Sequence, residues 1–128
     1  MPEVPEDLFY NADHDWVRID GNTGICGITD YAQGELGDIV FLELSGVGET
    51  VTQGEVYGTL EAVKTVSDLI SPVSGEILEV NEVLTEDASE VNTSPYGEGW
   101  MIKVRLQDAA EIEDLMNAEA YTKMVAGL

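Results

Sequence analysis

The alternation of hydrophobic and polar positions predicts short β-strands over most of the chain. Ile102, Val104 and Leu106 alternate with two cationic residues, which is typical of a strand with one buried face. Further apolar runs indicate three more strands, at residues 16–19, 24–28 and 39–44. We expect the strand at 39–44 to be buried because its run has almost no polar position. Turn residues at regular spacing separate short β-prone segments as far as residue 106, and this favours an all-β sandwich or barrel.

Helical signals lie at the periphery of this β pattern. Thr29 and Asp30 can cap a short helix over residues 31–36, which Gly37 would end. Between residues 107 and 125, apolar side chains at helical spacing predict a C-terminal helix: Ile112, Leu115, Met116, Ala120 and Met124. The predicted fold is therefore mainly β, with two sheets, short peripheral helices and a C-terminal helix.

Length and composition indicate one globular domain spanning residues 1–128. Hydrophobic residues make up 44% of the chain, which is enough for one modest core. No apolar run approaches the roughly 18 residues of a transmembrane helix. The single cysteine, Cys26, excludes an internal disulfide framework, and its apolar neighbours favour a buried, inert thiol. The first residues are acidic where a signal or transit peptide would be basic, so we expect a bacterial cytoplasmic protein, with a processed mitochondrial form as the alternative.

The charge balance narrows the choice of partners. The chain has 26 Asp and Glu residues against 5 Lys and Arg residues, which gives a formal net charge of −21. Binding to phosphate backbones requires clustered cations, so nucleic acid is excluded as a partner, and an anionic membrane surface would repel the chain. The acidity suits solubility, tolerance of salt, or attraction to basic surfaces on partner proteins.

Lysine is scarce, and one of the three lysines has no evident structural role. Lys103 lies on the polar face of a strand, and Lys123 lies near the end of the predicted C-terminal helix, where a cation complements the helix dipole. Lys64 lies in an apolar run that is open to two interpretations, because residues 60–66 favour a helical turn by composition. Alternatively, residues 54–75 form a β-hairpin with Lys64 at or near its tip, although no Asn-Gly or Asp-Gly pair marks that turn.

Nearly the whole chain matches one family at several places, in the same order and at the same spacing. The matching segments include His14-Asp15-Trp16-Val17, Gly27-Ile28-Thr29-Asp30-Tyr31-Ala32-Gln33, Leu36-Gly37-Asp38-Ile39-Val40-Phe41, Glu61-Ala62-Val63-Lys64-Thr65, Ser71-Pro72-Val73-Ser74-Gly75-Glu76 and Pro95-Tyr96-Gly97-Glu98-Gly99-Trp100. By these segments the chain resembles the H proteins of the glycine cleavage system, which are lipoyl carriers. The resemblance implies a barrel-sandwich hybrid fold of the biotinyl/lipoyl type, and a carrier that is not itself an enzyme.

The resemblance identifies Lys64 as the residue that receives lipoic acid in amide linkage. It also implies that the lipoate-attaching enzyme recognises the residues around Lys64, here Glu61, Val63 and Thr65. The family more often has Ser at the position of Ala62 and Ala at that of Thr65. Acylation would remove the charge of the lysine and leave a long, flexible arm.

The implied partners are glycine decarboxylase (P-protein), aminomethyltransferase (T-protein), dihydrolipoamide dehydrogenase (L-protein), and a lipoate ligase or lipoyl transferase. The chain itself is expected to be a monomer. A loaded arm would end in a cationic amine, and a cation held in a cleft needs a nearby anion. We expect Asp20 and Asp68 to supply it, although the family more often has Glu at the position of Asp20.

Other interpretations remain open at this stage. An H-like protein that relays lipoate to other enzymes would share these segments. Biotin carriers place Met on both sides of the modified lysine, where this chain has Val63 and Thr65, and lipoyl domains of 2-oxo acid dehydrogenases more often read Asp-Lys-Ala. The only histidine, His14, has no cysteine or histidine partner, so the sequence predicts a structural or surface role for it and no metal site.

Overall fold

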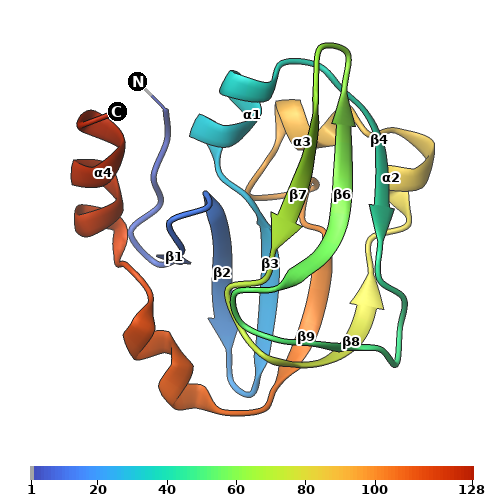
Figure 1. The fold of residues 1–128 in the computed structure, drawn as a ribbon. Coiled ribbons are helices and arrows are strands. Elements are labelled where there is room, and N and C mark those ends of the chain that lie inside the picture. The colour runs from blue at the N-terminus through green and yellow to red at the C-terminus, as the bar shows by residue number, and fades with distance from the viewer. Residues whose placement is uncertain (1) are drawn as a thin grey trace.

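The computed structural model describes residues 2–128 and consists of two β-sheets with short helices around them (Figure 1). The elements in chain order are β1 (Phe9–Tyr10), β2 (Asp15–Asp20), β3 (Thr23–Ile28), α1 (Asp30–Leu36), β4 (Ile39–Leu44), β5 (Thr50–Val51), β6 (Val56–Ala62), β7 (Val66–Ile70), β8 (Gly75–Val80), α2 (Val83–Glu86), α3 (Glu90–Thr93), β9 (Ile102–Leu106), the 3₁₀ helix η1 (Ala109–Asp114) and α4 (Ala118–Ala126).

The two sheets share one hydrophobic core. Six strands form one sheet in the order β1-β2-β3-β9-β8-β5, and three strands form the other in the order β4-β6-β7. Leu42, Leu60 and Leu69 of the three-stranded sheet belong to the same buried cluster as Ile77 and Val104 of the larger sheet. This open two-sheet arrangement confirms the predicted mainly-β fold of the barrel-sandwich type.

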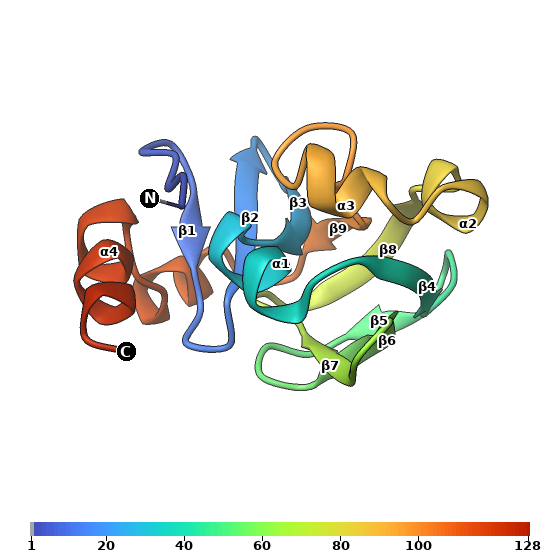
Figure 2. The ribbon, with the colours of Figure 1, turned by 90° about the horizontal axis from the view of Figure 1, so that it is seen from above.

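A second buried cluster attaches the C-terminal helix to the larger sheet. Tyr10 and Trp16 pack with Tyr121 of α4, and none of the three side chains is exposed to solvent. The rings of Tyr10 and Tyr121 stack with centroids 4.6 Å apart. Figure 2 shows α4 next to β1, on the side of the molecule away from β5. None of the helices in residues 2–128 is long and apolar enough to span a membrane.

The predicted C-terminal helix over residues 107–125 is not continuous. Met116 interrupts it, because its backbone N–H and C=O both bond to Tyr10 at 2.8 Å and extend the chain there. The helix α4 then begins afresh, with the Asn117 side chain accepting a hydrogen bond from the N–H of Ala120. Sequence analysis also missed α2 and α3, which have four residues each and are too short for helical periodicity to reveal.

The expectation that residues 39–44 form a buried strand is half wrong. The strand β4 has the predicted bounds, but only Ile39 and Leu42 are buried, while Val40 and Phe41 are 54% and 53% exposed. The reason lies in the topology, because β4 is an edge strand of the smaller sheet and its register with β6 shifts between Ile39 and Phe41.

Candidate functional site

Lys64 lies at the tip of the hairpin formed by β6 and β7. Val63, Lys64 and Thr65 join the two strands and are all exposed, and the N–H of Ala62 donates to the carbonyl of Thr65 at 2.8 Å to close the turn. The tip protrudes from the body at the top of Figure 1. The hairpin interpretation is therefore confirmed, and the alternative of a helical turn over residues 60–66 is wrong.

Contacts from outside the hairpin hold this tip, which contains no glycine. The N–H of Val63 donates to the carbonyl of Asp38 at 3.0 Å. The segment that contains Asp38 is fastened in turn by Asn92 of α3, whose amide donates to the carbonyl of Gly37 at 2.8 Å and accepts from the N–H of Ile39 at 2.9 Å. Sequence analysis missed this role of Asn92, because nothing local to residue 92 indicates a partner some 55 positions away.

The side chain of Lys64 lies over Gly37, the residue that ends α1. A Cβ atom at Gly37 would lie 3.2 Å from Cε of Lys64, so the absence of a side chain leaves room for the lysine stem. Gly37 also has a positive φ of 82°, which glycine adopts readily. Among residues 2–128, Lys64 is the one lysine without an ion pair, since Lys103 bonds to Glu79 and Lys123 to Glu119.

A cavity of about 280 Å³, the β7–α1 cavity, opens between β7, α1 and the turn before β2. Leu36 lines it and directly precedes Gly37, so the cavity adjoins the surface that the Lys64 stem covers. Within the described residues 2–128, no lysine or arginine lines this cavity. Its acidic lining residues come from three parts of the chain: Asp13, Asp15, Glu35 and Asp68. Electrostatically, the cavity suits a cation.

The buried wall of this cavity holds an unusual carboxyl group. Asp15 is only 1% exposed, and the Tyr57 hydroxyl donates to it at 3.5 Å. Burial raises the pKa of Asp15 well above its ordinary value, although hydrogen bonds from polar neighbours offset part of that rise. Sequence analysis did not single out Asp15, and the signal for it was a charged residue directly before the apolar run that forms β2.

The predicted site residues do not all meet. Glu61, Val63 and Thr65 surround Lys64, and Asp68 lines the β7–α1 cavity. Asp20, in contrast, is the last residue of β2 and pairs with Thr23 in the turn at the other end of that strand. The structure therefore does not bring Asp20 to the hairpin tip, and its contact with a loaded arm stays a prediction without support from this geometry.

The tip also carries exposed apolar side chains. Phe41 on β4 and Val66 on β7 lie on either side of Glu61, because Glu61 pairs with both in the sheet register. Four residues form this tip patch, Val40, Phe41, Val63 and Val66, and each is more than half exposed. Exposed apolar groups next to a protruding lysine are typical of a surface that contacts other proteins.

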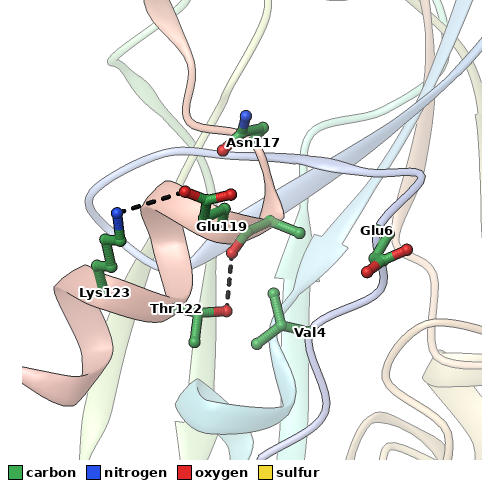
Figure 3. Close-up of a pocket in the computed structure, with 7 residues that line it drawn as sticks. Val4, Glu6, Asn117, Glu119, Thr122 and Lys123 are labelled. Atoms are coloured by element: carbon green, nitrogen blue, oxygen red, sulfur yellow. Dashed lines mark hydrogen bonds and ion pairs between the residues drawn. The ribbon is translucent and has the colours of Figure 1, made fainter.

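A larger hollow of about 530 Å³ lies against α4, and two of its polar side chains already have partners within it (Figure 3). Lys123 pairs with Glu119 at 3.3 Å, and the Thr122 hydroxyl donates to the carbonyl of Ala118 at 2.7 Å. None of its lining residues belongs to β6, β7 or their tip. In residues 2–128 there is also no group of three or more His, Cys, Asp or Glu side chains arranged to hold a metal ion.

The fold and the site together define a class of protein: a small two-sheet β protein that presents an exposed lysine at the tip of a hairpin. The profile of the family described as Glycine cleavage H-protein matches residues 8–127, nearly the whole chain. The chain belongs to this family, whose members are carrier proteins and not enzymes.

Individual relatives agree with this assignment over almost the full length of the chain. The glycine cleavage system H protein of Carboxydothermus hydrogenoformans is 51% identical over 125 residues, which cover 98% of this chain and 96% of the relative. That of Bacteroides thetaiotaomicron is 54% identical over 123 residues, with coverage of 96% and 98%. A crystal structure of a glycine cleavage system H protein from Mycobacterium marinum matches with a TM-score of 0.87 at 43% identity, over 97% of this chain and 99% of that one.

Proposed function

We propose that Lys64 carries lipoic acid in amide linkage and that the chain shuttles the aminomethyl group of glycine between the enzymes of the glycine cleavage system. The observation that carries this proposal is the exposed hairpin tip, which presents an unpaired lysine in a chain of the H-protein family. The lipoyl group would supply a flexible arm whose disulfide opens, so that one sulfur takes the aminomethyl group and the other becomes a thiol. No carboxylate in residues 2–128 pairs with Lys64, so its side-chain amine is available for acylation once it has lost a proton.

The proposed partners act on this tip in turn. Glycine decarboxylase (P-protein) would load the arm, aminomethyltransferase (T-protein) would unload it onto tetrahydrofolate, and dihydrolipoamide dehydrogenase (L-protein) would reoxidise the dithiol. The tip patch and the acidic residues near it, such as Glu43 and Glu61, support partner surfaces with an apolar centre and a basic rim. We further propose that the chain is a monomer of the bacterial cytoplasm.

Attachment of the arm would depend on the residues that flank Lys64. We propose that a lipoate ligase or lipoyl transferase reads Glu61, Val63 and Thr65, which lie beside Lys64 and are all exposed. Glu61 is fixed in place by its strand, because it pairs with Phe41 on one side and with Val66 on the other. A fixed carboxylate near the target lysine gives a basic enzyme surface a defined anchor.

We also propose that the β7–α1 cavity receives the loaded arm and protects it from hydrolysis. The cationic amine at the end of the arm would enter a cavity lined by four carboxyl groups and by no lysine or arginine in the described chain. Asp68 is the expected counter-ion on the hairpin side, because it lies on β7, the strand that leads directly away from the tip. The Lys64 stem lies over Gly37, which directly follows Leu36 of the cavity lining.

The decisive experiment is the intact mass of the chain after co-expression with a lipoate ligase and supply of lipoic acid. We expect one lipoyl group, mapped to the peptide around Lys64 and absent from Lys64→Arg. Lys103→Arg and Lys123→Arg serve as matched controls that keep the modification. An unmodified chain, with the ligase active on a control carrier, would refute the proposal. A lipoylated chain that glycine decarboxylase does not load would instead favour a lipoate relay.

A further inference from the structure

His14, the only histidine of the chain, ends a chain of hydrogen bonds that begins in a different part of the molecule. Its Nδ1 lies 2.8 Å from the hydroxyl of Tyr121 on α4. That hydroxyl lies 2.7 Å from the hydroxyl of Thr29, the residue that caps α1. Tyr121 and Thr29 are completely buried. His14 itself lines the β7–α1 cavity, and its ring centroid lies 4.9 Å from that of Tyr31 and 5.7 Å from that of Tyr121.

The partners of Thr29 favour one direction for the protons along this chain. The Thr29 oxygen accepts the N–H of Ala32 at 3.2 Å, and within residues 2–128 its one other partner is Tyr121. Because the Thr29 hydroxyl must donate its own proton somewhere, it donates to the oxygen of Tyr121. Tyr121 must then donate to Nδ1 of His14, and a nitrogen that accepts a hydrogen bond carries no proton.

We propose that Thr29 and Tyr121 hold His14 as the neutral imidazole with its proton on Nε2, and so keep a resident cation out of the β7–α1 cavity. Tyr121 is then a positioning residue for the carrier, although it lies on the C-terminal helix. This inference rests on the proposed function, because an uncharged cavity wall matters only if a cationic arm enters.

The carboxyl groups around His14 explain why hydrogen bonds are needed to hold its ring neutral. The titratable groups that contact the ring or line the same cavity come from every element packed there: Asp13, Asp15, Tyr31, Glu35, Asp68 and Tyr121. The charges of Asp13 and Glu35 favour a protonated imidazole, and an imidazolium would pair with the carboxylates that the arm requires. A neutral His14 leaves them available to the arm.

Two further observations agree with this arrangement. Burial lowers the pKa of His14, while the charges of Asp13 and Glu35 act in the opposite direction. Burial also raises the pKa of Tyr121 to about 12, so its phenol keeps the proton that it donates. The hydrogen bond from Tyr121 stabilises the neutral ring further, because it requires a lone pair on Nδ1.

The first test reads the tautomer directly in the lipoylated full-length chain. With a single histidine, a long-range ¹H–¹⁵N NMR spectrum of the labelled chain gives one pair of ring nitrogens. We expect an unprotonated Nδ1 and a protonated Nε2 at pH 7. A proton on Nδ1, or an imidazolium at that pH, would overturn the inference.

The second test measures how long a loaded arm survives as a function of pH. The reduced arm is loaded chemically: one thiol condenses with formaldehyde and ammonia, which forms the S–CH₂–NH₂ group and releases water. Hydrolysis reverses this step and returns the thiol, which is followed by mass. In Tyr121→Phe we expect loss about fivefold faster than in the native chain near pH 6, with little difference at pH 8, because the variant ring protonates more readily.

Tyr10→Phe is the matched control for the second test. It also removes a tyrosine hydroxyl from the cluster under α4, but that hydroxyl donates to the carbonyl of Pro5 and does not touch His14. We expect it to keep the native pH profile. A Tyr121→Phe profile like the native one, or one faster by the same factor at every pH, would overturn the inference.

The tautomer of His14 and the lifetime of the loaded arm together distinguish failure of this inference from failure of the proposed function. A wrong tautomer would overturn this inference alone and leave the proposed function intact. A correct tautomer with an arm lifetime insensitive to both Tyr121→Phe and Asp68→Asn would overturn the role of the cavity in the proposed function, and this inference with it.

Discussion

The two principal hairpins of the molecule, β2–β3 and β6–β7, turn at opposite ends of it and are stabilised in different ways (Figure 1). The β2–β3 turn connects Asp20 to Thr23 through Gly21 and Asn22, and Gly21 takes a positive φ of 61°. That turn is formed by the conformational preferences of its own residues. The β6–β7 tip has no glycine and depends on Asp38 and the segment fastened by Asn92. External support leaves the side chains of the tip free to meet partner proteins, which a carrier requires.

The largest effect, on lipoylation, is expected when the lysine is moved from the β6–β7 tip to the β2–β3 turn. In a chain with Lys64→Arg and Asn22→Lys together, we expect complete loss of lipoylation, because the β2–β3 turn lacks Glu61 and the tip patch. Intact mass and peptide mapping measure the outcome. Asn22→Lys alone is the control and should keep one lipoyl group, on Lys64. Modification at position 22 would mean that any exposed hairpin lysine is accepted.

The contrast between the hairpins also explains what the sequence can predict. The β2–β3 turn was predictable, because Asp20, Gly21 and Asn22 are turn residues between two apolar runs. The β6–β7 tip was not predictable from turn chemistry, and only the family resemblance identified Lys64. Its supports, Gly37 and Asn92, lie far from it along the chain, so their roles require the three-dimensional structure.

The acidic residues expected to contact the loaded arm were also only partly predictable from the sequence. Sequence analysis could place Asp20 at one end of a strand, but not decide which end of that strand faces the tip. Asp15 and Asp20 are the two ends of β2, about 17 Å apart at the usual rise per residue. The residue at the cavity is Asp15, and the residue at the far turn is Asp20.

The next largest effect separates the two predicted counter-ions, Asp68 and Asp20. In Asp68→Asn we expect a chemically loaded aminomethyl arm to hydrolyse about threefold faster, because a partly exposed charge pair contributes modestly. The measurement is the lifetime of the loaded arm by mass at pH 7. Asp20→Asn removes the same charge from the far turn and should leave the lifetime unchanged. Faster loss in Asp20→Asn alone would restore the role expected for Asp20 and refute that of Asp68.

A smaller effect on the lifetime of the loaded arm is expected at Gly37, over which the Lys64 stem lies. Gly37→Ala and Gly54→Ala both place a side chain at a positive φ, 82° and 86°, and each should lower the free energy of unfolding by about 1 kcal/mol. Only Gly37→Ala puts a methyl group against Lys64, since nothing lies within 4 Å of a Cβ at Gly54. We therefore expect about twofold faster loss of the loaded arm in Gly37→Ala alone. Equal lifetimes in both variants would show that the stem takes another path.

The smallest effect concerns the buried end of β2 and appears in the pH dependence of stability. Burial raises the pKa of Asp15 in the folded chain above its ordinary value of 3.8, so above that pH the folded chain keeps a proton that the unfolded chain has released. Its contribution to stability is complete below pH 3.8 and is lost as the pH rises toward the folded pKa. Asparagine at this position carries no such proton.

Relative to the native chain, Asp15→Asn should therefore become steadily more stable between pH 4 and pH 7, as measured by urea unfolding at each pH. Asp20→Asn is the control at the other end of the same strand. Asp20 is exposed, so Asp20→Asn removes the same charge from the chain without changing the buried wall of the cavity. If the curve of Asp15→Asn runs parallel to that of the native chain, Asp15 is already ionised in the folded chain. The cavity would then hold a permanent negative charge at its wall, where burial favours the protonated carboxyl.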